Sequence, residues 1–181
     1  MRAEAQVVAE KRSLAGFGRA KGNIPSMKPP MIGSGSRSRG LTKRDVLLAF
    51  IAAGEGPLDP VRIMKGMFLT AKEGELPPPL SYSFVPYSYG PCAFMIYDDI
   101  DALAAENLIE KRSVGARWPV YVATVTGKRE ADRIACAQPG LGNKVQGFRD
   151  YVSSRNFKTL LREVYAKYPD YASKSVFRDK A

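Results

Sequence analysis

The order of short periodic segments after residue 40 is the feature that most limits how this chain can fold. Three segments with helical periodicity come first, two β-rich segments follow, and helical periodicity then returns. Each helical segment carries a single apolar stripe, so none is stable alone and the stripes must be buried together. Helix, helix, helix, two-stranded hairpin is the order of a winged helix-turn-helix. The sequence therefore predicts an α+β, mainly helical fold: a winged helix-turn-helix with a C-terminal helical extension and a flexible N-terminal leader.

Capping signals predict where the first two helices begin. Thr42 is a suitable N-cap for a helix that closes at Gly54. Asp59 is a second N-cap, and Pro60 follows it at the first helical position, where the missing N–H costs nothing. The second helix is expected to run to about Lys72.

A proline-rich stretch separates the second helix from the third. Five prolines between residues 74 and 91 exclude a helix there, and helical periodicity resumes at Cys92 and ends near Asn107. The later elements are expected as strands at about 108–114 and 120–125, a helix at 127–137 capped by Thr126, and helices at about 143–154 and 157–168.

Charge and composition divide the chain into three parts. Residues 1–44 hold ten basic and two acidic residues, a net charge of +8, whereas residues 45–181 hold 18 basic and 16 acidic residues, a net charge of +2. We therefore predict a disordered basic leader at 1–40, a winged helix-turn-helix at 41–137, and a helical extension packed on it at 138–181. The leader has two interpretations: an arm that lies along nucleic-acid phosphates, or a solvated tail.

The rarity of metal-ligating and nucleophilic residues excludes several classes of enzyme. The chain has no histidine, and its only cysteines, Cys92 and Cys136, form no CxxC motif. Ser-His-Asp and Cys-His nucleophile pairs and His-ligated metal sites are therefore excluded. We expect a binding protein rather than an enzyme, with no metal and no small-molecule cofactor.

Two further absences bear on location. Two cysteines make no disulfide framework, and no apolar run approaches the ~20 residues that span a bilayer. The expectation is a cytoplasmic protein with no membrane partner.

The candidate partner-binding residues lie in an aromatic turn and on the third helix. Tyr87 and Tyr89 precede Gly90 and either form an exposed ledge, for a protein or for unpaired bases, or close the gap between helices. On the third helix, Tyr97, Asp98 and Asp101 lie in a segment without lysine or arginine. Carboxylates would face phosphates in a major groove, so this helix suits a basic protein partner better than DNA.

The candidate nucleic-acid contacts are basic residues of the second helix and the hairpin. On the second helix, three of them are spaced to form one stripe; in the hairpin, Arg117 could enter a minor groove. The alternative is a solvated hairpin with Trp118 packed across its strands. The candidates are Arg62, Lys65, Lys72, Lys111, Arg112 and Arg117.

Several motifs between residues 41 and 175 resemble the Panacea, or SocA-like antitoxin, winged-helix family and related prokaryotic proteins. They are the Met-Phe-Leu run that ends the second helix, the aromatic segment 82–91, the segments 97–100 and 103–108, and the ending 164–172. The most specific is the Tyr-Gly-Pro turn at 89–91, which leads into the third helix. The resemblance implies a prokaryotic or phage-linked binding protein that acts as an antitoxin or proteolytic adaptor. The basic leader departs from the family pattern.

Two functions from different classes follow from these observations. The first is a non-enzymatic winged-helix module that binds a protein, antitoxin- or adaptor-like, through the acidic third helix and the aromatic turn. The alternative is a winged-helix regulator that contacts duplex DNA through the wing and the basic N-terminal arm.

Overall fold

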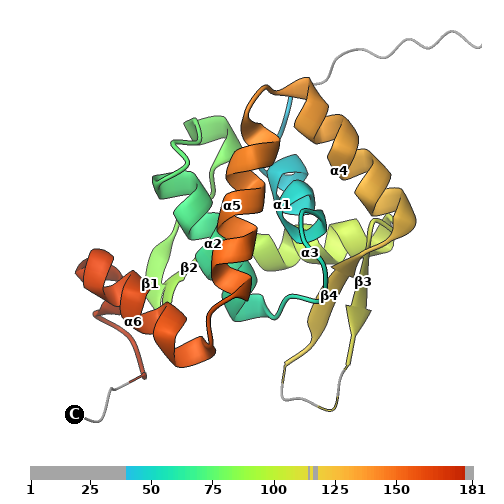
Figure 1. Ribbon diagram of the computed structural model, residues 1–181. Helices are drawn as coiled ribbons and strands as arrows, with labels where there is room; N and C mark the ends of the chain where they lie inside the picture. Colours follow the sequence, from blue (N-terminus) through green and yellow to red (C-terminus); the bar gives the residue numbers. More distant parts are fainter. Residues whose placement is uncertain (1–39, 114, 116–117, 178–181) are drawn as a thin grey trace, which may run out of the picture. The chain divides into compact units, whose positions relative to one another are not determined.

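The computed structural model describes residues 40–113, 115 and 118–177, and this part of the chain is α+β and mainly helical (Figure 1). Its helices are α1 (Lys43–Ala52), α2 (Pro60–Lys72), α3 (Met95–Ala105), α4 (Val125–Ala137), α5 (Leu141–Ser153) and α6 (Phe157–Lys167), with 3-10 turns at Pro78–Leu80 and Pro169–Ala172. Its strands form two antiparallel pairs, β1 (Val85–Tyr87) with β2 (Gly90–Cys92) and β3 (Ile109–Arg112) with β4 (Val120–Ala123).

The predicted starts of the first two helices are confirmed. Thr42 and Asp45 form a capping box, in which each side chain accepts a hydrogen bond from the other residue's backbone N–H. The Asp59 carboxylate accepts from the Arg62 backbone N–H at 2.9 Å, and Pro60 is the first residue of α2. These caps satisfy backbone donors that have no partner inside the helix.

The third helix begins later than the sequence indicates. Residues 90–92 are not helical but form β2, which pairs with β1 in the register Val85↔Cys92 and Tyr87↔Gly90. Gly90 makes this tight hairpin feasible because its φ is +88°, a conformation that favours glycine. Because the pairing keeps the chain extended through Cys92, α3 begins only at Met95.

The fourth helix begins earlier than predicted, and its cap is Thr124 rather than Thr126. The Thr124 hydroxyl accepts from the Gly127 backbone N–H at 3.0 Å and donates to the Asn107 carbonyl at 2.7 Å. The same side chain thus starts α4 and ties it to the end of α3. The β-branched residues continue through Val125, and threonine is common both in strands and at helix caps. The sequence pattern therefore did not show where β4 ends and α4 begins.

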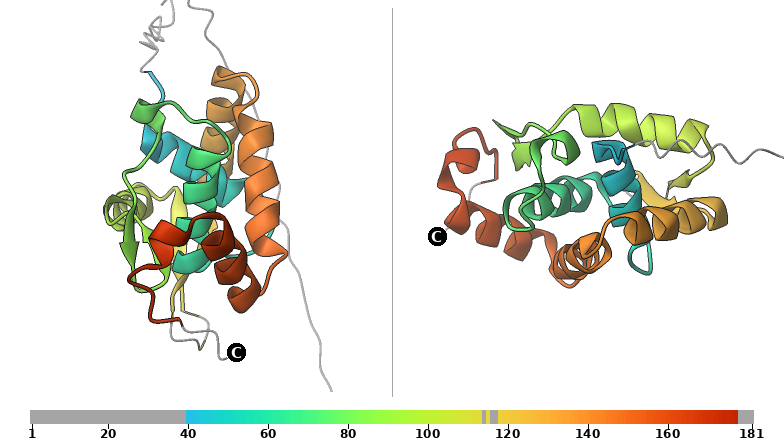
Figure 2. Two further views of the ribbon diagram at one scale, coloured as in Figure 1. Left: turned by 90° about the vertical axis from the view of Figure 1, so that its left-hand side faces the viewer. Right: turned by 90° about the horizontal axis from the view of Figure 1, so that it is seen from above.

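Helices α1 and α2 form the centre of the described unit. Seen from above in Figure 2, they lie between α3 on one side and α5 on the other. Residues 46–51 of α1 are all buried, and Phe50 and Phe68 are inaccessible to solvent. The α1–α2 loop joins the β3–β4 hairpin, because Leu58 and Tyr121 exchange two backbone hydrogen bonds of 3.0 and 2.9 Å.

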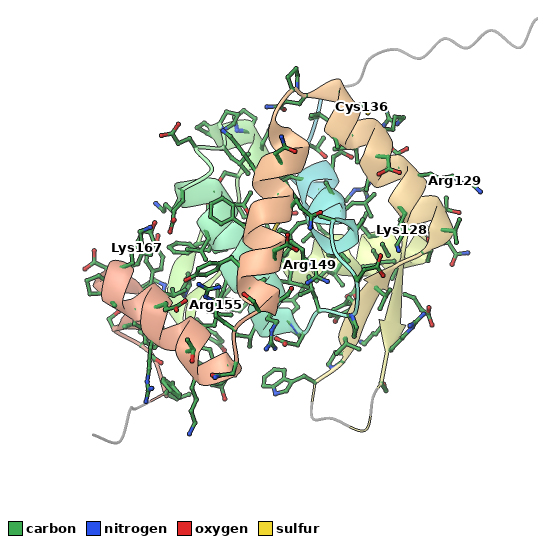
Figure 3. All side chains as sticks on the ribbon, in the orientation of Figure 1. Lys128, Arg129, Cys136, Arg149, Arg155 and Lys167 are labelled. Carbon is green, nitrogen blue, oxygen red and sulfur yellow. The ribbon has the colours of Figure 1, made fainter. Side chains whose placement is uncertain are left out.

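Arg149 ties α5 to the α1–α2 loop. Its side chain is 1% exposed and donates to the Gly56 carbonyl at 2.8 Å and to the Ser153 hydroxyl (Figure 3). The buried guanidinium loses most of its hydration, and this burial lowers its pKa. The C-terminal extension is therefore part of the same packed unit as the first two helices.

The last described segment, from α6 to residue 177, packs on the β1–β2 hairpin and on α2. The rings of Tyr168 and Tyr171 meet Phe68 edge to face, and the Val176 N–H donates to the Ser88 carbonyl at 2.9 Å. A Cβ on Gly90 would lie 2.6 Å from Tyr165 Cε1, so only glycine allows this close approach. The hairpin is thereby held in one position. Among the described residues, no helix is both long and apolar enough to cross a membrane.

Candidate functional site

Most of the exposed large apolar side chains come from three segments of the chain. Of eight such side chains in the described part of the chain, six come from β1, the start of α3 and the end of the β3–β4 loop. Five of them, which are 38–52% exposed, are called the aromatic face: Val85, Tyr87, Phe94, Tyr97 and Trp118. The sixth, Met95, lies on the α1 side of α3, where its Sδ accepts from Lys43 Nζ at 3.3 Å. The rings of Tyr87 and Phe94 pack edge to face with centroids 5.1 Å apart. Tyr87 also lines one cavity with Tyr97 and Trp118. Exposed apolar side chains that gather in this way are typical of an interaction site.

A cavity of about 190 Å³ opens within the aromatic face. Residues 60–65 of α2 form one wall, the β1–β2 hairpin forms another, and Tyr97 and Trp118 complete it. Tyr89 also lines the cavity, and its ring packs edge to face on Trp118, with centroids 6.2 Å apart, and on Phe157, with centroids 5.7 Å apart. The hairpin that the sequence analysis selected is therefore one wall of a cavity and not only an exposed ledge.

Lys65 is the buried cation of this cavity. It is 2% exposed, and its Nζ donates to the Pro91 carbonyl at 3.0 Å. Gly90 and Cys92, on either side of Pro91, both line the cavity, so the ammonium lies at its β2 wall. Burial lowers the pKa of Lys65 to about 8, while the nearby Cys92 and the more distant Asp59 act in the opposite direction. The ammonium is still the major form at pH 7.

The other polar side chains that line the cavity are a thiol, three phenols, the Ser88 hydroxyl and the Trp118 indole. Burial raises the pKa of the Cys92 thiol and of the Tyr97 phenol. No described residue forms a hydrogen bond with the hydroxyl of Tyr87, Tyr89 or Tyr97, so each can donate to a ligand. The cavity therefore combines apolar walls with a few converging donors, which is the composition of a binding pocket.

The acidic side of α3 lies next to the aromatic face. Asp98 and Asp101 are exposed, as the sequence analysis expected. Asp99 is half-buried and accepts from the Tyr82 hydroxyl at 2.6 Å, and burial together with this bond raises the pKa of Tyr82. Glu106 pairs with Arg44 at 2.7 Å. Asp98 and Asp101 thus remain the carboxylates of α3 that face solvent without a partner among the described residues.

The predicted basic stripe on α2 is wrong as a solvent-exposed feature. Lys65 is buried beneath the β1–β2 hairpin, and only Lys72 is fully exposed. Arg62 pairs with Asp59 and donates to the Val152 carbonyl at 3.2 Å. The spacing did place the three charges on one side of α2, but other elements of the fold cover Lys65 and part of Arg62.

The basic residues of the hairpin and α4 are only partly available. Lys111 is exposed, but Arg112 pairs with Glu110 at 2.8 Å, and Arg117 lies outside the described residues. On α4, Lys128 and Arg129 are exposed at the end of the helix nearest the β3–β4 hairpin (Figure 3). Trp118 does not lie flat across the strands but lines the cavity.

Sequence reasoning missed two parts of this site: Phe94 and the cavity position of Lys65. The sequence did carry a signal for Phe94, because it falls outside the apolar stripe of Ile96, Ile100 and Leu103 and so had no place in the core. Lys65 carried none, since its burial depends on a hairpin more than twenty residues away.

Comparison with protein-family models finds no match, and comparison with curated proteins finds none either. Within the part of the chain that the structure describes, no group of three or more cysteines, aspartates and glutamates is placed to hold a metal ion.

Proposed function

We propose that this chain is a non-enzymatic winged-helix module whose main role is to bind another protein through the aromatic face and the adjacent acid of α3. The element order is compatible with a winged helix, and the Leu58–Tyr121 bridge supplies the position of its third short strand. The resemblance to the Panacea family carries the same expectation of an antitoxin- or adaptor-like binding role.

The observation that carries the proposal is the aromatic face itself. Trp118 and Tyr87 remain 46% and 49% exposed beside a preformed cavity, and tryptophan and tyrosine are the residue types most enriched at protein-binding hot spots. Asp98 and Asp101 border this surface and favour a partner with basic residues next to its apolar anchor.

Replacing Tyr87 and Phe94 together with serine is expected to reduce partner capture at least tenfold. The face would lose two exposed rings that pack on each other, and a hot-spot loss of about 2 kcal/mol already exceeds a factor of ten. The measurement is quantitative mass spectrometry of the proteins that tagged chains retain from a native extract.

The matched control is Val125→Ser, a 70% exposed apolar residue on α4, outside the aromatic face. It should leave the retained proteins unchanged. Equal retention by the wild type and the Tyr87/Phe94 variant would contradict the proposal.

Duplex DNA is the second candidate partner, and the exposed Lys128 and Arg129 favour it. They lie at the hairpin end of α4 and have no ion-pair partner among the described residues. Contacts there, with the basic residues of the leader, could neutralise phosphates. Helix α3 does not support major-groove reading, because Met95–Ala105 contains no lysine or arginine.

A salt titration on duplex DNA separates the two candidates. We expect the chain without residues 1–40 to bind DNA only weakly at physiological salt, and Lys128→Ala with Arg129→Ala to change little, because residues 41–181 hold 20 basic and 16 acidic residues, a net charge of only +4. Fluorescence anisotropy at several salt concentrations measures this. Tight binding by the shortened chain, with a log K slope of about −0.9 per phosphate contact that the two substitutions reduce, would favour the DNA-binding alternative.

A further inference from the structure

The cavity in the aromatic face contains a cation whose hydrogen-bond donors are used only in part by the described residues. An ammonium has three donors, and the Pro91 carbonyl accepts one of them at 3.0 Å. No carboxylate of the described residues forms an ion pair with Lys65 Nζ. The Asp59 carboxylate is occupied by the Arg62 backbone N–H and guanidinium and acts on Lys65 only from a longer range.

A buried charge with spare donors indicates an anionic ligand. Burying a cation is costly unless an opposite charge or several hydrogen bonds compensate it. Burial lowers the pKa of Lys65 to about 8, in line with a charge that one carbonyl contact compensates only in part. A ligand carboxylate at the β2 wall would compensate the charge of Lys65. The hydroxyls of Tyr87 and Tyr97 could donate to the second oxygen of that carboxylate.

The remaining walls specify an apolar group on the same ligand. Trp118, Tyr97 and Met64 line the cavity together with the apolar part of α2. Its volume of about 190 Å³ is below the roughly 300–1,000 Å³ of sites for drug-sized molecules, so it suits a single side chain. The side chains of aspartate and glutamate bring a carboxylate without an apolar group, whereas the last residue of a polypeptide can bring both.

We propose that the cavity receives the C-terminal residue of the partner protein, with its carboxylate on Lys65 and its apolar side chain between Trp118 and Tyr97. This inference rests on the proposed function and names the part of the partner that is recognised. Asp98 and Asp101 then favour basic residues just upstream of that terminus.

Trp118 provides a direct measurement, because it is the chain's only tryptophan and lines the cavity. The probes are a short basic peptide that ends in phenylalanine with a free carboxylate, the same peptide as its C-terminal amide, and 3-phenylpropanoate. We expect the peptide acid to change Trp118 fluorescence of the full chain and to bind at least tenfold more tightly than the amide.

The substitution Lys65→Met tests the cation, and Lys72→Met is its matched control on the exposed end of the same helix. The first should remove the preference for acid over amide, and the second should leave it unchanged. Equal binding of acid and amide to the wild type, or an acid preference that survives in Lys65→Met, would overturn the inference. Binding of 3-phenylpropanoate as tight as that of the peptide acid would also overturn it, by assigning the cavity to a small free acid.

The affinity of the peptide acid should also fall as the pH rises above about 8, because the ammonium form holds the carboxylate. The titratable groups around Lys65 are Asp59 at the start of α2, Cys92 on β2, Tyr87 and Tyr89 on the hairpin, and Tyr97 on α3. Burial raises the pKa of Cys92 and of Tyr97, so these two do not compete near pH 8. An affinity that stays constant from pH 7 to pH 10 would count against Lys65 as the anion-binding group.

The partner-capture experiment keeps the two proposals separable. If capture depends on Tyr87 and Phe94 while peptide acid and amide bind alike, the C-terminal inference fails and the proposed function stands. If capture does not depend on them, the proposed function fails.

Discussion

Replacing Gly127 with alanine is expected to lower the free energy of unfolding by about 3 kcal/mol. A Cβ at this position would lie 1.8 Å from the Leu108 carbonyl oxygen and 2.8 Å from its carbonyl carbon. The obstacle is backbone, so it cannot rotate away as a side chain could. Gly127 also donates its N–H to the Thr124 cap, and the start of α4 would have to move away from the α3–β3 junction.

The matched control for this prediction is Gly147→Ala on α5. Gly147 is also helical, but a Cβ there would meet nothing within 4 Å. Alanine should stabilise the helix there by about 0.5–1 kcal/mol, because glycine loses more conformational freedom on folding. Urea unfolding followed by circular dichroism measures both variants. Similar stabilities for Gly127→Ala and the wild type would show that α4 does not need this close contact.

Replacing Lys65 with methionine is expected to raise the free energy of unfolding at pH 7 by about 2 kcal/mol. Lowering the pKa from 10.5 to about 8 means that burial of the ammonium costs about 3 kcal/mol at neutral pH. Methionine removes this cost and fills a similar volume, but it leaves the Pro91 carbonyl without its partner, which costs about 1 kcal/mol. The net effect is stabilising.

The pH dependence of this effect distinguishes it from a simple packing change. Between pH 8 and 10.5 the unfolded chain binds more protons at Lys65 than the folded chain, so the wild type gains stability as the pH rises through this window. The advantage of methionine is therefore complete below pH 8 and lost by about pH 10.5. Urea unfolding at pH 7 and pH 10 measures it, with the surface variant Lys72→Met expected to stay within about 0.5 kcal/mol of the wild type.

A wild type that is more stable than Lys65→Met at pH 7 would show that the ammonium is fully compensated within the fold. If Lys65→Met is the more stable protein, as we expect, the ammonium is not fully compensated within the fold. A buried charge that lowers stability is typical of a site kept for binding, since proteins lose stability where function needs an unsatisfied group. The stability measurement thus tests the premise of the C-terminal inference without any ligand.

Local signals in the sequence located most of the helices. Thr42 and Asp59 cap α1 and α2 as expected, because a cap is a contact between residues three positions apart. The β3–β4 hairpin also follows the β-rich pattern. The boundaries of α3 and α4 were wrong by a few residues, because β1–β2 pairing and the Thr124 contact to Asn107 involve residues that the local pattern does not relate.

The sequence by itself determined that this chain is an α+β, mainly helical protein without histidine chemistry, with an acidic α3 and an aromatic turn. The tertiary structure alone decided which side chains form a site. Helical spacing puts Arg62, Lys65 and Lys72 on one side of α2, but only the packing of α5, the loop that follows it and the β1–β2 hairpin determines which of the three reaches water. Lys65 became a buried cavity cation rather than a surface contact because burial depends on elements distant in sequence, and one helix's periodicity contains no information about them.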